Sequence, residues 1–189
     1  DIRNMRKLLG ELGVQAEDTD AGLKLEVEDE SASHARYDIV RTMRASICVL
    51  GPLLAKRGKA VVSMPGGCAI GERPIDLHLR AMKALGAEIE LDGGNIVATA
   101  KQLHGARVFL GGPFGSTVLG TANLMSAATL AQGTTIIEQA ACEPEVVDLA
   151  NALNAMGAQI RGAGTPRITI DGVDHLTGAE HTVIADRIE

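Results

Sequence analysis

The sequence MKALGA at residues 82–87 closes an amphipathic segment, and similar endings, LGELGV and LNAMGA, occur upstream and downstream of it. The closing glycines of the three copies, Gly13, Gly86 and Gly157, are 73 and 71 residues apart. In each copy the apolar residues recur every three or four positions, which predicts a helix. Each glycine stands where the C-terminus of a helix favours a left-handed residue. A fixed spacing of similar segments predicts a fold built from repeated units.

Each closing glycine is followed by a short strand, a polar turn and a second strand. The second strands alternate with period two, as half-buried β-strands do. Their sequences are LKLEV, IVAT and ITI, at residues 23–27, 96–99 and 168–170. The pattern therefore predicts a helix and a strand pair in every repeat.

A helix followed by a single strand also recurs. One apolar stripe predicts a helix over residues 43–54, before a strand that follows Gly58, and a second helix is expected over residues 123–131, before a strand that follows Gly133. The repeated unit is thus about seventy residues of alternating helices and strands. This pattern excludes a four-helix bundle and predicts an α/β (α+β) domain made of repeated units.

The two ends of the sequence interrupt this repeat. The first residues already lie in a helix with no strand before it, and no second helix follows the third strand pair. We therefore expect the chain to be an excerpt of a longer polypeptide.

Composition and charge narrow the classes of function. Of the 189 residues, 46% are hydrophobic and 22% are charged, so the chain can bury a core. The net charge of −6 argues against a general role on nucleic acid or on a membrane surface. No apolar run approaches the roughly 20 residues needed to span a bilayer. We expect neither nucleic acid nor membrane as a partner.

The cysteines and histidines show no spacing typical of a metal site. Cys48, Cys68 and Cys142 form no C-x-x-C pair, and the five histidines are scattered. We therefore expect no disulfide framework, no metal and no cofactor, and a reducing, cytoplasmic location.

The segment PGGCAIGERPIDLH, residues 65–78, carries the strongest functional signal. Its glycines predict a loop around the thiol of Cys68. Pro74 suits the first position of the following helix and Asp76 its first turn. The N–H groups of that turn, with Arg73 beside them, predict a site for an anion such as phosphate. The thiol is thus a candidate nucleophile or proton donor, although a small buried thiol in a tight turn fits the residues equally well.

This loop resembles the active-site loop of the UDP-N-acetylglucosamine 1-carboxyvinyltransferase family, a branch of the enolpyruvyl transferases (EPSP synthase-like proteins). The resemblance spans nearly the whole chain. It includes RTMRASI at 41–47, NLM at 123–125, GTTIIE at 133–138, EPEVVD at 143–148 and DRIE at 186–189. The branch that makes 5-enolpyruvylshikimate 3-phosphate shares the fold but lacks this loop.

The resemblance implies a particular architecture. The family has two similar domains, each an inside-out α/β barrel of three βαβαββ units, with the active site in the cleft between them. Residues 1–189 are then expected to form a single domain, the one with the cysteine loop, while the second domain of the parent protein is absent. Because half of the cleft is missing, we expect the isolated chain to be inactive.

The resemblance also implies a reaction. The family transfers the enolpyruvyl group of phosphoenolpyruvate to the 3′-hydroxyl of UDP-N-acetylglucosamine and releases phosphate, the first committed step of peptidoglycan synthesis. Cys68 matches the family's general acid, which also forms a covalent adduct with phosphoenolpyruvate. Arg44 and Arg73 match its anion-binding arginines, because a guanidinium suits carboxylate and phosphate. Taken without the resemblance, Arg44 would be interpreted as a solvated helix residue.

Two stretches match the parts of the family that hold the UDP group. They comprise Arg73, Pro74, Ile75, Asp76 and Leu77 in the first stretch, and Ser116, Thr117 and Val118 in the second. The second stretch departs from the family, which usually reads SVGAT where residues 117–121 read TVLGT, so that Leu119 replaces a glycine. The glycine-rich run at 111–113 either compensates or is a plain turn. The departure leaves an alternative open: a domain of this family that binds a UDP-sugar without turnover.

Other polar residues are assigned structural or undecided roles. Cys142 stands where the family commonly has Arg and is interpreted as structural, and Cys48 is expected in the core. Glu143 and Glu145 are interpreted as acids at a helix start. His78 is expected either beside the UDP stretch or on a helix surface.

Overall fold

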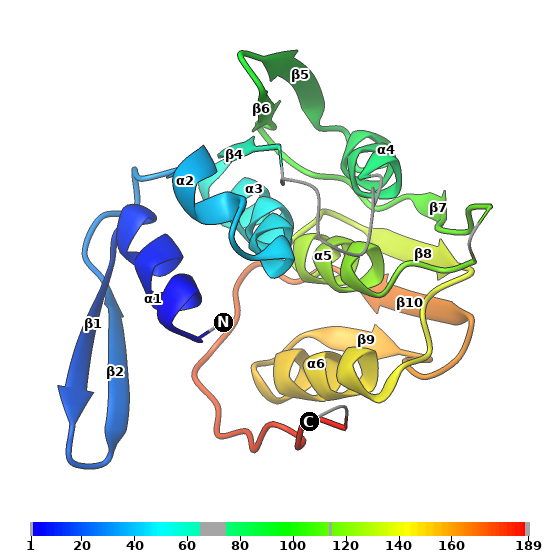
Figure 1. Ribbon diagram of the computed structural model, residues 1–189. Coiled ribbons are helices and arrows are strands. Elements are labelled where there is room, and N and C mark those ends of the chain that lie inside the picture. Colours follow the sequence, from blue (N-terminus) through cyan, green and yellow to red (C-terminus); the bar gives the residue numbers. More distant parts are fainter. Residues whose placement is uncertain (1, 65–74, 114, 188–189) are drawn as a thin grey trace.

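The computed structural model describes residues 2–64, 75–113 and 115–187. Within these ranges the strands form two four-stranded sheets and one separate hairpin. Each four-stranded sheet is accompanied by its own helices, and the hairpin extends away from the rest of the chain (Figure 1).

The first four-stranded sheet belongs to residues 34–99. Its elements are β3 (His34–Ala35), α2 (Tyr37–Val40), the 3₁₀ helix η1 (Arg44–Val49), α3 (Leu50–Arg57), β4 (Lys59–Ser63), α4 (Asp76–Ala84), β5 (Glu88–Asp92) and β6 (Asn95–Thr99). The strand order is β3-β4-β6-β5. Strands β3 and β4 are parallel, whereas β6 runs antiparallel to both β4 and β5.

The second four-stranded sheet repeats this topology. Its elements are β7 (Arg107–Phe109), α5 (Val118–Ala128), β8 (Thr134–Glu138), α6 (Pro144–Ala155), β9 (Gln159–Arg161) and β10 (Arg167–Asp171). The strand order β7-β8-β10-β9 again begins with a parallel pair and continues with antiparallel pairs. Both sheets therefore belong to complete β-α-β-α-β-β units, which we call the middle unit (β3 to β6) and the last unit (β7 to β10).

The N-terminal segment corresponds to the second half of such a unit. It consists of α1 (Ile2–Glu11), β1 (Val14–Thr19) and β2 (Gly22–Val27), and β1 and β2 pair antiparallel. Leu23, Leu25 and Val27 alternate along β2 and are 43–52% exposed. An apolar face of a strand is thus uncovered within the described residues.

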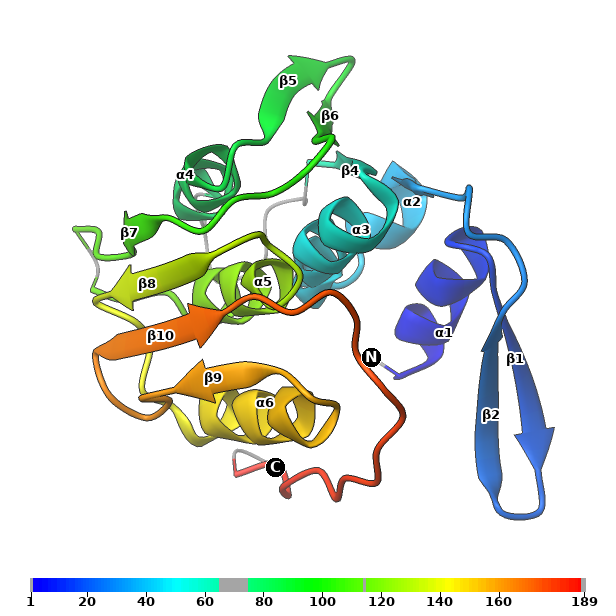
Figure 2. The same cartoon turned by 180° about the vertical axis from the view of Figure 1, so that it is seen from behind.

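The helices of each complete unit pack on one face of its sheet, as Figure 2 shows for α5 and α6 behind β8, β10 and β9. Buried and less buried residues alternate along β6, β8 and β10, as expected for strands with one face against helices. Helix α5 lies centrally and packs against α3, α4, α6 and η1. The core is aliphatic, with Leu54, Met82, Leu124, Ile137 and Ile170 almost fully buried.

The predicted helix endings are confirmed. Gly13, Gly86 and Gly157 follow α1, α4 and α6 with φ angles of 79°, 94° and 99°, all in the left-handed region. At Gly13 a Cβ atom would also lie 2.1 Å from the carbonyl oxygen of Asp29, so a side chain is excluded there twice over.

Two predicted helix boundaries are wrong. The helix expected over residues 43–54 is divided into the 3₁₀ helix η1 and the α-helix α3. The helix expected over 123–131 is α5, which begins earlier, at Val118, because the Thr117 side chain caps its first turn. Apolar spacing does not report such changes, because the four stripe residues, Met43, Ile47, Leu50 and Leu54, are buried in either helix type.

Candidate functional site

The described residues of the predicted site lie at the beginnings of three helices. Arg44 begins η1, Ile75, Asp76 and Leu77 begin α4, and Ser116, Thr117 and Val118 begin α5. Both η1 and α4 pack against α5 (Figure 1). The fold therefore brings together parts of the site that are separated by more than seventy residues in the sequence.

The remaining predicted site residues, Cys68, Arg73 and Pro74, lie outside the described residues. The chain enters this segment from β4 and leaves it at the start of α4. The loop prediction and the role of the Cys68 thiol therefore stay predictions.

Arg44 is half-buried, unlike the solvated helix residue that the sequence alone suggested. Its charge acts on two neighbouring titratable groups. Burial raises the pKa of Cys48 to about 11, and the Arg44 charge opposes this rise. Burial lowers the pKa of His78 to about 4; Arg44 lowers it further and Asp76 opposes. At neutral pH both neighbours are uncharged, and Arg44 contributes positive charge beside the start of α4.

The first turn of α4 presents a carboxylate and an apolar side chain. Asp76 is exposed in this turn, Ile75 is buried at the N-cap position, and Leu77 is half-buried. Leu77 also lies close to Gly112: a Cβ atom on that glycine would be 3.5 Å from Leu77 Cδ1.

Gly112 and Gly115 pair with each other next to Leu77. The backbone N–H groups of Gly112 and Gly115 donate to each other's carbonyl oxygens, at 2.9 and 3.0 Å. Arg80 on α4 donates to the carbonyl oxygens of Phe109 (2.7 Å) and Gly111 (3.2 Å). The glycine-rich run is therefore a turn, and Arg80 fastens it to the same helix that carries Leu77.

The first turn of α5 is held by two threonines. The Thr117 hydroxyl accepts a hydrogen bond from the N–H of Gly120 at 3.1 Å. The Thr121 hydroxyl donates to the Thr117 carbonyl at 2.7 Å and accepts from the N–H of Ala141 at 3.0 Å. Leu119, the departure from the family pattern, lies inside the helix and packs against the core. Its position needs no left-handed backbone, so a glycine is not required there.

Asn123 is a residue of this region that the sequence did not single out. Its side chain is fully buried on α5 and bonds to the backbone of Ile47 and Gly51 and to the ring of His78. The signal that could have found it is a carboxamide within the apolar run of α5, because a buried polar side chain needs partners. His78 is itself buried, at 2% exposure, so the alternative of a helix-surface role is wrong.

The remaining sequence interpretations concern residues away from these helix starts. Cys48 is half-buried and packs against the core. Cys142 is exposed, and its sulfur lies 3.7 Å from the Ala140 carbonyl oxygen. Glu143 and Glu145 lie at the N-cap and in the first turn of α6, as predicted. Glu145 also accepts from Arg187 at 2.8 Å, which lowers its pKa.

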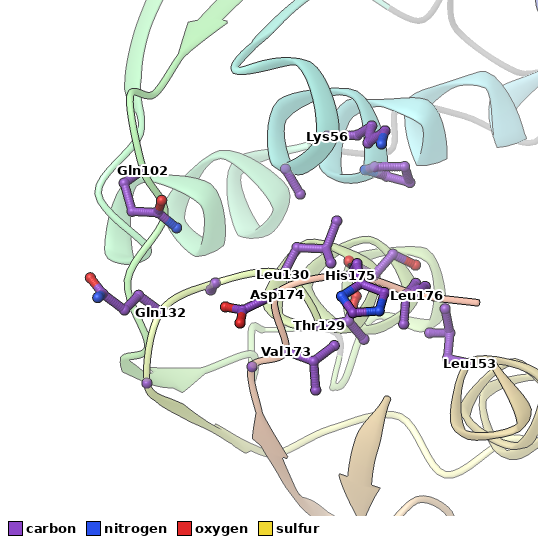
Figure 3. A pocket seen from close by; sticks show the side chains of 16 residues that line it. Lys56, Gln102, Thr129, Leu130, Gln132, Leu153, Val173, Asp174, His175 and Leu176 are labelled. Atoms are coloured by element: carbon purple, nitrogen blue, oxygen red, sulfur yellow. Dashed lines mark hydrogen bonds between the residues drawn. The ribbon is translucent and has the colours of Figure 1, made fainter. Parts of the chain in front are cut away.

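A cavity of about 760 Å³ lies away from the predicted residues (Figure 3). Its walls come from the later parts of α3, α5 and α6 and from residues 172–176, and they include Lys56, Gln132, Asp174 and His175. The predicted residues of α5 stand at the opposite end of this helix, which is 11 residues long and therefore about 16 Å in length. None of the predicted site residues that the structure describes lines this cavity.

The described residues show neither a metal-binding cluster nor a membrane-spanning helix. Outside residues 1, 65–74, 114 and 188–189, no group of three His, Cys, Asp or Glu residues could hold a metal ion. Within the same described ranges, no helix has the length and apolar character needed to cross a membrane.

Solved structures with a similar fold are enolpyruvyl transferases. The enolpyruvyl transferase NikO from Streptomyces tendae matches with a TM-score of 0.73 over 90% of this chain and 40% of its own, at 20% identity. EPSP synthase from Acinetobacter baumannii matches with a TM-score of 0.68 over 93% of this chain and 40% of its own, also at 20% identity. At this identity the likeness establishes the fold: a mixed α/β chain that corresponds to part of a larger enzyme.

Relatives found by sequence have a higher identity to this chain than these solved structures have. Proteins named UDP-N-acetylglucosamine 1-carboxyvinyltransferase are 54% identical in Akkermansia muciniphila and 56% identical in Coxiella burnetii, in each case over 100% of this chain. The chain spans 44% and 43% of these relatives, less than half of their length. The profile of EPSP synthase (3-phosphoshikimate 1-carboxyvinyltransferase) matches residues 1–189. The chain therefore belongs to the EPSP synthase family of 1-carboxyvinyltransferases.

Proposed function

We propose that the full-length protein transfers the enolpyruvyl group of phosphoenolpyruvate to the 3′-hydroxyl of UDP-N-acetylglucosamine and releases phosphate, as the first committed step of peptidoglycan synthesis. The observation that carries this proposal is the identity of 53–56% to proteins named for that activity, over the whole of this chain. Because the chain spans only 43–45% of those relatives, the activity is assigned to the longer protein.

We also propose that residues 1–189 form one domain of that enzyme, an inside-out barrel of three βαβαββ units. Two complete units with the same strand order support this, and so does the half-unit α1-β1-β2. A preceding strand would pair with β2, and a preceding helix would cover the exposed side chains of Leu23, Leu25 and Val27. A second domain would form the opposite wall of the cleft.

In the proposed reaction Cys68 supplies a proton. The 3′-oxygen bonds to C2 of phosphoenolpyruvate as its hydroxyl proton passes to a base in the cleft, and C3 takes up the Cys68 proton, which gives a tetrahedral adduct. The bond between C2 and the phosphate oxygen then breaks with phosphate as the leaving group, and C3 returns a proton to the Cys68 thiolate, so that the enol double bond is restored. An acid placed over C3 contributes about 10²–10⁴-fold to such a step.

The anions of the substrates are assigned to Arg44 and Arg73. The half-buried position of Arg44 at the start of η1 supports this role, because a charge in a partly dry site interacts more strongly with an anion. Its charge acts on the neighbouring groups Cys48 and His78, and the pKa shifts of both keep them uncharged at neutral pH.

The UDP group is assigned to the starts of α4 and α5, with Pro74, Ile75, Asp76 and Leu77 on one side and Ser116, Thr117 and Val118 on the other. The packing of α4 against α5 supports a single site made from both. The first N–H groups of a helix have no partner within the helix, so the first turn of α5 can donate to a diphosphate. Leu119 leaves these backbone groups in a helical arrangement, which favours turnover over the binding-only alternative.

The test is a phosphate-release assay on the full-length protein with both substrates. We expect Cys68→Ala to lower phosphate release at least about 100-fold, because the acid is lost. Cys142→Ala is the matched control, since that thiol is exposed and is not among the residues proposed to contact substrate; its turnover is expected to equal that of the wild type. A phosphonate epoxide that mimics phosphoenolpyruvate is expected to label Cys68. Labelling of Cys142 or Cys48 instead would refute the role assigned to Cys68.

Two further outcomes separate the alternatives. Calorimetric binding of UDP-N-acetylglucosamine without phosphate release would support a binding domain without turnover. The isolated 189-residue chain is expected to release no phosphate, because water enters a half-cleft and screens its charges. We assign the enzyme to the cytoplasm, where the Cys68 thiol stays reduced.

A further inference from the structure

The Asn123 carboxamide on α5 bonds to the junction between the 3₁₀ helix η1 and the α-helix α3, more than seventy residues earlier in the chain. Its Oδ1 accepts from the N–H of Gly51 at 2.6 Å, and its Nδ2 donates to the carbonyl oxygen of Ile47 at 3.0 Å. In a regular α-helix the N–H of residue 51 would donate to the carbonyl of residue 47. The carboxamide thus bonds to both backbone groups at the point where η1 passes into α3.

These two backbone partners fix the orientation of the amide. Gly51 can only donate and Ile47 can only accept, so the oxygen faces Gly51 and the nitrogen faces Ile47. The second hydrogen on Nδ2 then points to His78 Nδ1, 3.1 Å away. His78 Nδ1 must accept, and its ring proton therefore lies on Nε2. Asn123 selects one neutral tautomer of a buried histidine.

The bonded groups adjoin the proposed substrate contacts. Ile47 follows Arg44 by three residues, and in a 3₁₀ helix residues three apart lie on the same side. His78 directly follows Asp76 and Leu77 in the first turn of α4. A displacement of Asn123 would therefore move the anion contact and the UDP contact relative to each other.

The packing around Asn123 leaves no room for adjustment. A Cβ atom on Gly51 would lie 2.3 Å from the Asn123 carbonyl oxygen and 2.5 Å from Oδ1. Asn123, Ile47 and His78 are each at most 2% exposed. The two helices approach closely because a glycine faces the carboxamide.

We propose that Asn123 is a positioning residue, which holds Arg44 and the start of α4 in one fixed relation and holds His78 as a neutral Nε2–H donor. This inference rests on the proposed function for the roles of Arg44, Asp76 and Leu77. Among the described residues, the charged groups that act on His78 are Arg44 and Asp76.

The tautomer is tested by nitrogen NMR of the full-length protein with ¹⁵N-labelled histidine. At pH 7 we expect the His78 ring to show an unprotonated Nδ1 and a protonated Nε2. Asn123→Asp keeps the acceptor for Gly51 but removes the donor to His78, so the Nδ1 signal is expected to change to that of a protonated nitrogen. A wild-type spectrum with the proton on Nδ1 would overturn the proposal without the need for any variant.

The positioning role is tested by steady-state kinetics on the full-length protein with Asn123→Ala. We expect kcat/KM for both substrates to fall between about 10-fold and 100-fold, because a small misplacement of contacts has effects of this size.

Asn154→Ala is the matched control. Asn154 on α6 also makes two bonds to backbone, with the N–H (2.8 Å) and the carbonyl (2.9 Å) of Ile160, but it lies away from the three helix starts. It is expected to lower the melting temperature to a similar degree and to leave kcat/KM unchanged. Equal losses of kcat/KM in both variants, or none in Asn123→Ala, would contradict a positioning role.

The two proposals can fail separately. Absence of phosphate release by the wild-type enzyme would defeat the proposed function, whereas the NMR experiment would still decide the tautomer. Normal turnover together with an Asn123→Ala variant of unchanged kcat/KM would defeat only the positioning role.

Discussion

The helices that precede β4 in the middle unit (η1 and α3) and β8 in the last unit (α5), which we call the inner helices, correspond in position but differ in helix type. Aligned by Gly58 and Gly133, which precede β4 and β8, Ser46 of η1 coincides with Thr121 of α5. Both side chains are fully buried, and both hydroxyls donate to a backbone oxygen earlier in the chain. The acceptors of Ser46 are the carbonyl oxygens of Val40 and Met43, and that of Thr121 is the carbonyl oxygen of Thr117. The two aligned residues lie in different helix types, a 3₁₀ helix in one unit and an α-helix in the other.

The same alignment places Arg44 opposite Leu119 and Cys48 opposite Asn123. The middle unit therefore carries the half-buried cation, and the last unit carries the carboxamide that bonds to the middle unit. The two units share one strand order, and the described residues proposed to contact substrate lie at the starts of η1, α4 and α5.

The largest expected effect is on stability, from alanine at the glycine of each inner helix. A Cβ atom on Gly51 meets the Asn123 carbonyl oxygen at 2.3 Å, and one on Gly120 meets Thr117 Cγ2 at 2.3 Å. Backbone cannot give way as a side chain can, so Gly51→Ala is expected to lower the free energy of unfolding by about 3 kcal/mol and Gly120→Ala by less. Denaturant unfolding measures both.

A second substitution separates these two clashes. Thr117→Ser removes Cγ2 but keeps the capping hydroxyl, so it is expected to recover part of the loss in Gly120→Ala and nothing in Gly51→Ala. Equal recovery in both variants would show that the Gly51 contact is not with backbone.

An intermediate effect is expected from pH. His78 and Leu149 both stand eight residues before the closing glycine of their unit, so only the middle unit carries a titratable group at this position. The pKa of His78 is about 4 in the folded chain and about 6.5 when unfolded, so the unfolded state binds more protons between these values. This contribution is fully present above pH 6.5 and is lost as the pH falls toward 4. It amounts to about 2 kcal/mol between pH 7 and pH 5.

His78→Gln is the comparison for this pH dependence. Its free energy of unfolding is expected to change less than that of the wild type between pH 7 and pH 5, as measured by urea titrations at both pH values. Parallel pH curves for the two proteins would show that His78 is accessible to protons in the folded state.

The smallest expected effect concerns the helix caps. Thr117 caps α5 with its hydroxyl, whereas Met43, the N-cap residue of η1, makes no side-chain cap bond. Thr117→Ala is expected to lower the free energy of unfolding by about 1 kcal/mol, and Thr117→Ser to preserve it. Thermal unfolding of the two variants measures the difference. An unchanged Thr117→Ala variant would show that the first turn of α5 is held by Thr121 alone.

Local patterns in the sequence predicted the repeat well. The closing glycines and the strands after Gly58 and Gly133 depend on residues close together in the chain, and each is found in the structure. The predicted alternation of buried and less buried residues is found in β6 and β10, whereas β2 is exposed along its whole length. The division into η1 and α3 was not predictable in this way. It involves hydrogen bonds from Asn123, which lies 72 residues after Gly51.

The candidate site was predictable as a set of segments but not as a geometry. The residues themselves pointed to the start of α4, and the resemblance to the family added Arg44 and the start of α5. The sequence did not show that His78 is buried or that Asn123 bonds to it, because a buried polar pair between distant helices has no local pattern. The same limit applied to Leu119, whose helical position became clear only from the packing of α5.

The exposed apolar side chains of β2 affect the behaviour of the isolated 189-residue chain in solution. Among the described residues β2 pairs only with β1, so its other edge can pair with a strand of another molecule. Leu23, Leu25 and Val27 add an exposed apolar face beside this edge. The isolated chain is therefore expected to aggregate in solution. A synthetic peptide that donates the neighbouring strand in trans should keep it monomeric, which would turn the excised domain into a split-protein reporter.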